Sequence, residues 1–252
     1  MLLEVVNLHK SFGPISVLRG VDLSLRAGEV LALVGDNGAG KTTLIKHIAG
    51  VYKQDGGEIR LNGTPLTLHS PADARRLGIE TVYQDLALAD ELSVGANIFL
   101  GREPVRHWLG VLPVIDKRRI SRETDALLSR IESRIPGAAR AVSRLSGGQR
   151  QAVAIARALY WQAKVVILDE PTAALAAMER EHVIQLAHKL AREGVGVIYI
   201  GHNLIEILEV ADRVAVMYRG RIEHVTEAAA TTQQELIKYM TGFSETRGTV
   251  PN

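Results

Sequence analysis

The sequence predicts an α/β protein with a parallel sheet at its core, an antiparallel β region near its N-terminus and a helical insertion in its middle. Two continuous apolar runs of strand length, 165–168 and 195–200, flank a helical segment, which is the strand, helix, strand order of parallel sheets. Apolar and polar residues alternate over 3–8 and 15–25 between glycine turns, as they do in antiparallel strands. Over 86–145 the strand signals thin out and helical spacing replaces them.

The composition is that of a globular protein with a substantial core. The chain has 252 residues, of which 46% are hydrophobic and 23% are charged. It has no cysteine, which excludes a disulfide scaffold and a thiolate metal site. No apolar run approaches the length that spans a bilayer, and the first residues lack the layout of a signal peptide, so we expect a soluble chain. The net charge of +2 gives no electrostatic argument for nucleic acid, and the basic cluster at 117–119 is more typical of a solvated face.

The remaining elements are expected in the following order. An apolar run at 30–34 predicts the first core strand, which leads into a helix from Lys41 to about Gly50. Further short strands are expected at 58–62 and 79–84. In the middle, near-helical spacing favours a helix that Pro136-Gly137 closes, through Leu127, Leu128, Ile131 and Ile135.

The C-terminal third predicts a helix, a hairpin and a last short helix. One apolar helical face ends at Gly194 and consists of Val183, Leu186, Ala187 and Leu190. A hairpin is expected over 214–224 and a helix over 234–240, where Thr232 and Glu235 match a capping box. The last ten residues are expected to be a tail.

The stretch 34–43, which reads VGDNGAGKTT, carries the strongest chemical signal. It matches G-x-x-x-x-G-K-[ST] between a strand and a helix, the context that a phosphate-binding loop requires. Gly35, Gly38 and Gly40 would allow positive φ and a close approach of backbone N–H groups to phosphate oxygens. Lys41 would reach the β- and γ-phosphates, and the Thr42 hydroxyl would coordinate Mg²⁺. A chance glycine-rich turn is the alternative, which the motif alone does not exclude.

Two carboxylates follow the apolar run at 165–168. Asp169 and Glu170 stand at the carboxyl end of that strand, where open α/β sheets bind their ligands. Asp169 is suited to hold Mg²⁺ through water, and Glu170 to polarise the water that attacks the γ-phosphate. A solvated acidic turn is the alternative, and the phosphate loop in the same chain argues against it.

The segment 145–149, LSGGQ, predicts a second anion site. Ser146 and Gln149 match a capping box, and Gly147 and Gly148 leave N–H donors exposed at the positive end of a helix. The phosphate loop of the same chain has no need of a second set of donors. We therefore expect this site to take a phosphate from elsewhere.

Together these motifs resemble those of ATP-binding cassette (ABC) transporter ATPases along nearly the whole chain. GDNGAGKTT, the glutamine after the strand at 79–83, LSGGQ, VVILDE and the histidine of IGH occur in that family's order. The resemblance implies a P-loop NTPase (RecA-like) core with an N-terminal antiparallel β subdomain and an inserted helical subdomain. The core would comprise 1–85 and 155–225, the helical subdomain 86–154, and a C-terminal helix and tail 226–252.

The resemblance adds further site residues. It implies that Gln84 senses Mg²⁺ or the attacking water and touches the membrane subunit, that His202 contacts the γ-phosphate, and that LSGGQ binds the ATP of a second subunit packed head to tail. It also implies that Phe12 stacks on adenine, with a core phenylalanine as the alternative. The expected catalytic residues are Lys41, Gln84, Glu170 and His202, and the expected metal ligands are Thr42, Gln84 and Asp169. The expected nucleotide-binding residues are Phe12, Gly35, Asn37, Gly38, Ala39, Gly40, Lys41, Thr42, Thr43, Ser146, Gly147, Gly148 and Gln149.

The amino-acid sequence of 70–86 and 97–103 is similar to that of bacterial monosaccharide importer ATPases of the ribose, xylose and fructose type. At Ala176 most of the family has an aspartate that crosses the dimer, and this importer branch often lacks it. Alanine has no side-chain group that could couple the two ATP sites through a hydrogen bond. The resemblance implies ATP and Mg²⁺ as cofactors. As partners it implies a homodimer or a homologous cassette, a transmembrane permease and, indirectly, a periplasmic sugar-binding protein. The expected location is the cytoplasmic face of the bacterial inner membrane, as a peripheral subunit.

Other functions fit the residues less well. A P-loop GTPase would need an N-K-x-D motif, which the sequence lacks. An ABC protein of ribosomes or DNA would be expected to carry tandem cassettes or a long coiled-coil insertion, and strongly basic arms. An exporter cassette, or an importer of a substrate other than a sugar, shares every catalytic motif and stays open as an alternative. A scaffold without catalysis would have lost some phosphate-facing residue, and these residues are present.

Overall fold

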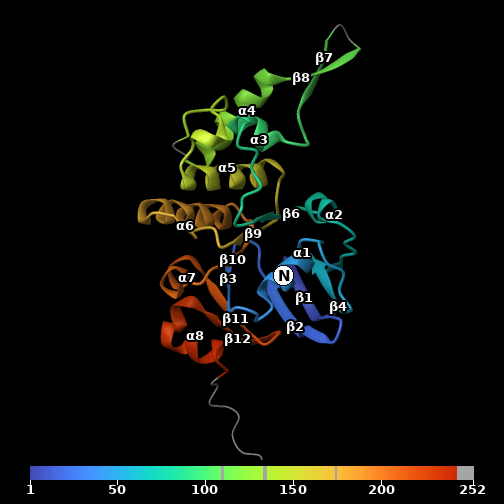
Figure 1. Ribbon diagram of the computed structural model, residues 1–252, viewed down its shortest axis with the longest axis vertical. Helices are drawn as coiled ribbons and strands as arrows, with labels where there is room; N and C mark the ends of the chain where they lie inside the picture. Colours follow the sequence, from blue (N-terminus) through green and yellow to red (C-terminus); the bar gives the residue numbers. More distant parts are fainter. Residues whose placement is uncertain (109–110, 133–134, 174, 243–252) are drawn as a thin grey trace, which may run out of the picture.

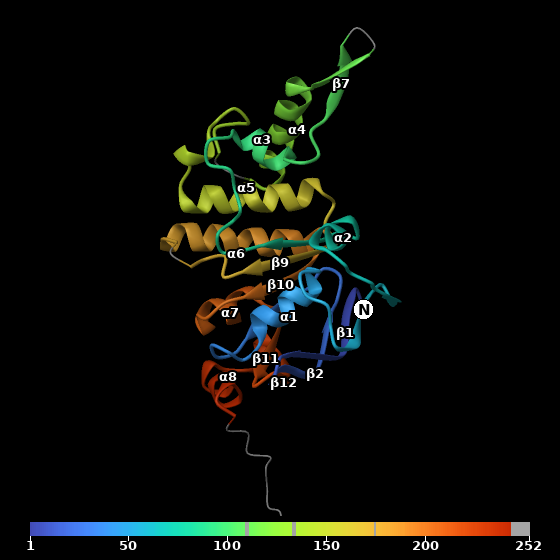
Figure 2. The ribbon, with the colours of Figure 1, turned by 45° about the vertical axis from the view of Figure 1, so that its right-hand side comes forward.

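The computed structural model describes residues 1–108, 111–132, 135–173 and 175–242. Its strands form a six-stranded sheet, a four-stranded sheet and a two-stranded ribbon. Figures 1 and 2 show an elongated molecule in which helical layers are stacked on one side of the six-stranded sheet and the ribbon projects at the far end of those layers. The predicted α/β class is confirmed.

The six-stranded sheet consists of β3 (Val30–Val34), β6 (Ile79–Val82), β9 (Val165–Asp169), β10 (Gly196–Ile200), β11 (Arg213–Tyr218) and β12 (Arg221–Glu227). Their order is β12-β11-β3-β10-β9-β6. All neighbouring pairs are parallel except β11 and β12, which form the predicted hairpin. Because β3, β6, β9 and β10 run in one direction, the loops that follow them leave the same edge of the sheet.

The four-stranded sheet consists of β1 (Leu3–Phe12), β2 (Ile15–Leu25), β4 (Gly56–Leu61) and β5 (Thr64–Pro65), and its order is β2-β1-β4-β5. All of its pairs are antiparallel, as the alternating pattern predicted. The first strand extends to Phe12, beyond the predicted end at residue 8, because its pairing with β2 continues to the turn.

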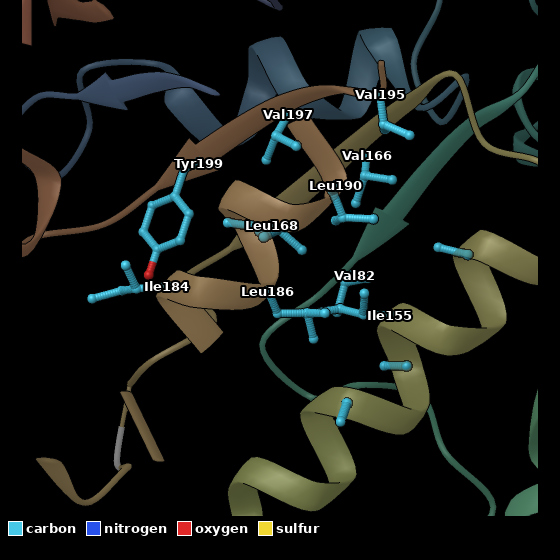
Figure 3. Packing of buried hydrophobic residues seen from close by; sticks show 14 of the residues in the cluster. Val82, Ile155, Val166, Leu168, Ile184, Leu186, Leu190, Val195, Val197 and Tyr199 are labelled. Atoms are coloured by element: carbon cyan, nitrogen blue, oxygen red, sulfur yellow. The ribbon is translucent and has the colours of Figure 1, made fainter. Parts of the chain in front are cut away.

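The side chains of the parallel sheet alternate between two hydrophobic cores. Val166 and Leu168 pack toward α5 (Gly147–Tyr160) and α6 (Ala177–Arg192), and Figure 3 shows them in one cluster with Ile155 of α5. Val165 and Ile167 face the other core, with α1 (Lys41–Ile48), α2 (Pro71–Arg76) and the four-stranded sheet. A strand that is covered on both faces must be apolar at every position, which explains the unbroken run in the sequence.

The middle of the chain contains α3 (Val94–Phe99), α4 (Lys117–Arg130) and a 3-10 turn (Val142–Arg144) before α5, as a helical insertion predicts. It also contains the ribbon of β7 (Val105–Trp108) and β8 (Leu112–Ile115), which sequence reasoning missed. The predicted helix end at Pro136-Gly137 was wrong, because α4 stops at Arg130 and Glu132 adopts a φ of 53°. Ile131 and Ile135 are buried beyond the helix, so their spacing reflected burial alone.

The C-terminal part contains α7 (Leu204–Val210), a short 3-10 turn (Ala228–Ala230) and α8 (Gln233–Met240), whose capping box between Thr232 and Glu235 is present as predicted. The predicted strand at 79–84 is shorter and ends at Val82. The tail at 243–252 lies outside the described residues. In the part of the chain that the structure describes, no helix combines the length and the apolar character needed to cross a membrane.

Candidate functional site

The predicted phosphate loop, residues 35–40, connects β3 to α1 at the carboxyl edge of the sheet. The φ angles of Gly35, Gly38 and Gly40 are 154°, 82° and 110°, so the predicted positive values are confirmed. A Cβ on Gly35 would lie 2.2 Å from the carbonyl oxygen of Met217, and one on Gly40 would lie 2.8 Å from the Met217 Cε atom. Nothing lies within 4 Å of the same position on Gly38. Gly35 and Gly40 therefore let the loop pack against β11, whereas Gly38 faces open space.

Lys41 begins α1, and its side chain is folded over the loop. Its Nζ atom donates to the carbonyl oxygens of Gly35, at 2.6 Å, and Asp36, at 3.1 Å. Burial lowers the pKa of Lys41, against the attraction of the nearby carboxylates Glu170, Asp36 and Asp169. A phosphate oxygen is a stronger acceptor than a neutral carbonyl, so a bound phosphate can replace these two hydrogen bonds.

The ends of β9 and β10 bring Glu170 and His202 together. Asp169 pairs with Ile200 in the parallel register, and the Glu170 N–H donates to the Ile200 carbonyl at 3.0 Å. The Nε2 atom of His202 lies 2.7 Å from the Oε1 atom of Glu170. Glu170 has a φ of 50°, a left-handed conformation that costs about 1 kcal/mol or more outside glycine. The chain thus accepts strain at the residue predicted to act on water.

The donors predicted to hold Mg²⁺ fit a hard cation, which prefers oxygen ligands. Thr42 is exposed in the first turn of α1, next to Lys41. Burial and, to a smaller extent, the negative charge of Glu170 raise the pKa of Asp169, and a cation bound beside the carboxylate would favour its charged form. Gln84 is exposed just beyond the end of β6, which is the direct neighbour of β9.

The other predicted loop residues also lie at this edge. Asn37 is exposed, Ala39 is buried, and the carbonyl oxygen of Thr43 lies 2.7 Å from Nδ1 of His47. All of them belong to the loop or to the first turn of α1, so the structure keeps the predicted nucleotide-binding stretch in one continuous segment.

Phe12 is 42% exposed at the end of β1, which argues against the alternative of a core phenylalanine. Its ring meets the ring of Tyr52 edge to face, with 5.3 Å between the centroids. Lys46 and His47 of α1 contact the Tyr52 ring in turn. Sequence reasoning missed Tyr52, although an aromatic residue shortly after the phosphate-loop helix was a signal for it. Phe12 therefore presents an exposed ring that α1 helps to orient.

The LSGGQ segment starts α5, and its capping box is present. Ser146 accepts from the Gln149 N–H, and the Gln149 side chain accepts from the Ser146 N–H at 3.1 Å. A Cβ on Gly147 would lie 2.7 Å from Leu175, and one on Gly148 would lie 3.0 Å from Glu179 of α6. The Ser146 hydroxyl, followed by the Gly148 and Ala176 N–H groups, holds the pKa of Glu179 below its usual range.

The structure does not place LSGGQ against the phosphate loop of its own chain. Figures 1 and 2 show α6 between α5 and the layer that holds β3 and α1. Gly147 fits closely against Leu175, just before α6, and Gly148 fits against Glu179 of α6, so the start of α5 is packed on the start of that helix. The two segments predicted to donate hydrogen bonds to phosphate, the phosphate loop and LSGGQ, therefore lie in different layers of the chain.

Ala176 is exposed at the N-cap of α6, with φ −67° and ψ 159°. Its backbone N–H donates to Oε2 of Glu179 at 3.4 Å, but its methyl side chain offers no oxygen to the helix. The departure from the family pattern thus leaves this helix with half of a capping box.

Comparison with known proteins identifies the family. The family model described as ABC transporter matches residues 18–173, which is more than half of the chain. The chain is 46% identical to the xylose/arabinose import ATP-binding protein of Sulfolobus acidocaldarius, over 96% of this chain and 95% of that protein. It is 42% identical to the fructose import ATP-binding protein of Rhizobium meliloti, over 97% and 95%. A ribose import ATP-binding protein of Rubrobacter xylanophilus is 44% identical, but the chain spans only 47% of its length.

Solved structures agree with this relationship. A nucleotide-free ATP-binding cassette from an ABC transporter superimposes with a TM-score of 0.79 at 27% identity, over 96% of this chain and 95% of that one. A cassette solved as a dimer in a post-hydrolysis state with ADP and Pi superimposes with a TM-score of 0.74 at 26% identity, over 90% and 99%. The phosphate loop, the paired carboxylates and the family model together show that this chain belongs to the ABC transporter family, as an ATP-binding cassette with ATPase activity.

Proposed function

We propose that this ATPase powers the import of a simple sugar through a permease in a bacterial inner membrane, to whose cytoplasmic face it binds. The observation that carries this proposal is the identity of more than 40% to two sugar import ATP-binding proteins over at least 95% of their lengths. Both proteins are importer subunits by name, one for xylose and arabinose and the other for fructose.

In this proposal the residues at the sheet edge act on the γ-phosphate and on a water. Lys41 exchanges its two carbonyl acceptors for phosphate oxygens. Glu170 takes the proton of the attacking water, and His202, 2.7 Å from Glu170, holds that carboxylate and contacts the γ-phosphate. Thr42, Asp169 and Gln84 would hold Mg²⁺, which when bound supplies positive charge that polarises the phosphate oxygens.

We further propose that the active form is a head-to-tail dimer with a second copy or a homologous cassette. The LSGGQ donors and the phosphate loop lie in different layers of the chain, so one ATP can meet both sets only if they come from two chains. The related cassette solved as a dimer after hydrolysis supports this arrangement. ATP would then close the dimer, and hydrolysis would remove the contacts that hold it closed.

The permease would sense this closure through the Gln84 segment and the helical insertion. Gln84 follows β6, whose neighbour β9 carries Asp169, so the Gln84 segment leaves the same edge of the sheet as the phosphate site. A periplasmic sugar-binding protein would deliver the sugar from the other side. We also propose that the chain is divided into a core of 1–85 and 155–225, a helical subdomain of 86–154 and a C-terminal part from 226. The boundary at 154 lies within α5, which runs without interruption from Gly147 to Tyr160.

A cassette for a substrate other than a sugar, in an importer or an exporter, is the second candidate, because the phosphate site would be the same. Uptake by intact cells separates the two. The gene would be deleted from its source organism, and the uptake of labelled xylose, ribose and fructose would be measured. We expect the deletion strain to lose uptake of at least one of these sugars. The wild-type gene should restore that uptake, and Glu170→Gln or Lys41→Ala should not. Unchanged uptake of every simple sugar tested would contradict sugar import and leave the ATPase assignment intact.

A further inference from the structure

A buried carboxylate on α7 joins the two strand ends that carry Glu170 and His202. Glu206 is 6% exposed, and its Oε1 atom accepts two hydrogen bonds. One comes from the Thr172 hydroxyl and the other from the Tyr199 hydroxyl, each at 2.5 Å. Bonds of this length from a hydroxyl to a charged oxygen are at the strong end of the range for proteins.

The two donors belong to the two catalytic segments. Thr172 lies two residues beyond Glu170, in the turn that follows β9. Tyr199 lies in β10, three residues before His202, and its ring is fully buried in the core that Figure 3 shows. Glu206 itself is in the first turn of α7, which Asn203 caps directly after His202. One oxygen atom of Glu206, which follows His202, therefore joins the segment after Glu170 to the strand before His202.

A gain in folding stability does not by itself explain why a carboxylate is buried here. Burying a carboxylate is costly, and among the described residues no salt bridge pairs Glu206 with a cation. Apolar side chains of similar size in place of all three partners, Glu206, Thr172 and Tyr199, would fill the same space without burying a carboxylate. The Thr172 bond does, however, anchor the turn two residues after Glu170, whose backbone is under strain. Glu170 holds a left-handed φ of 50°, and such a conformation persists only when its surroundings determine it from several sides.

Burial and the bond to Glu206 also raise the pKa of Tyr199, so its hydroxyl stays protonated and remains a donor. The Thr172 hydroxyl has no competing ionisation. Neither donor hydroxyl therefore loses its proton near neutral pH.

From these contacts we propose that Glu206 is a positioning residue, which through Thr172 and Tyr199 sets the distance and orientation of Glu170 relative to His202. The inference rests on the proposed role of Glu170 as the base. Glu206 touches neither ATP nor water in this scheme and acts only through its two donors. A small error in the position of a catalytic group costs a large factor in rate, so the effect should appear in turnover and not in ATP binding.

The test uses Thr172→Val, which keeps the shape of the side chain and removes one donor, and Tyr199→Phe, which removes the other. Thr226→Val, at a threonine of β12 away from the site, is the matched control. We expect kcat to fall by about tenfold or more in each site variant, with KM and Kd for ATP within about twofold of wild type. Glu206→Gln keeps an acceptor oxygen and should retain more turnover than Glu206→Ala.

The same substitutions in a Glu170→Gln background separate positioning from general loss of structure. If Glu206 acts through Glu170, Thr172→Val should lower the residual turnover of Glu170→Gln by less than twofold. A full tenfold loss in both backgrounds, or an equal loss of ATP affinity, would overturn the inference. Wild-type turnover in both Thr172→Val and Tyr199→Phe would also overturn it. Failure of Glu170→Gln itself to lower turnover would instead contradict the proposed role of Glu170.

Discussion

Glu80 in β6 should make the stability of this protein depend on pH. The residue is 8% exposed, and its Oε1 atom has no hydrogen-bond partner among the described residues. Burial raises its pKa from 4.5 to about 7, although Arg75, Arg157 and Arg102 act in the opposite direction. These cations are engaged elsewhere, since Arg157 donates to two backbone carbonyls and the other two lie over the ring of Trp161. Their attraction therefore only partly offsets the burial.

The sign and the size of the effect follow from the pKa. Because the folded pKa lies above the unfolded one, the folded state binds more protons between pH 4.5 and about 7. The contribution of protonated Glu80 to stability is therefore complete below pH 4.5 and is lost as the pH rises through 7. A shift of this size corresponds to at most about 3 kcal/mol in the free energy of unfolding.

Glu80→Gln replaces the carboxyl group by a neutral amide of the same shape, so this loss should disappear. Urea unfolding at pH 5 and pH 8 measures it, with Glu223→Gln, at an exposed glutamate of β12, as the control. We expect Glu80→Gln to be more stable than wild type by about 2–3 kcal/mol at pH 8 and by less than about 1 kcal/mol at pH 5. Equal stabilities of Glu80→Gln and wild type at both pH values would refute this reasoning.

Three further predictions concern the nucleotide site and Ala176, at the start of α6. Gly35→Ala places a Cβ 2.2 Å from the Met217 carbonyl, so it should abolish ATP binding in a fluorescence titration, whereas Gly63→Ala, which also has positive φ but meets nothing within 4 Å, should bind normally. Phe12→Ala should weaken ATP binding by about tenfold through loss of stacking, and Phe12→Tyr should bind like wild type; equal affinities for all three would exclude stacking. Ala176→Ser should complete the capping box of α6 and raise the free energy of unfolding by about 1 kcal/mol in urea. No gain in stability would show that the Glu179 N–H is already satisfied by the Ala176 carbonyl, to which it donates at 3.0 Å.

The sequence was most informative where a short segment determines its own conformation. The phosphate loop needs positive φ at three fixed positions and a helix directly after them, so its residues alone predicted its geometry. The apolar run before Asp169 predicted a strand covered on both faces, and Ser146 with Gln149 predicted a capping box that is present. In each of these cases the physical cause acts within a few residues.

Contacts between distant segments were beyond such reasoning. Glu170 and His202 are 32 residues apart, and only the pairing of β9 with β10 brings their side chains to 2.7 Å. The acceptor that joins Thr172 to Tyr199 came from α7, which no local pattern near either donor indicates. The ribbon of β7 and β8 was missed because its strands are short and contain Pro113, which weakens any strand signal.

The head-to-tail dimer is the central claim, because it alone brings LSGGQ and the phosphate loop to one ATP. Its most direct test is the mass of Glu170→Gln in solution by light scattering, with and without Mg-ATP. We expect a monomer without nucleotide and a dimer with Mg-ATP, and we expect Ser146→Arg in the same background to stay monomeric, because it blocks the second anion site. A dimer of the same stability without nucleotide, or one that Ser146→Arg leaves intact, would contradict the claim that ATP joins the two chains.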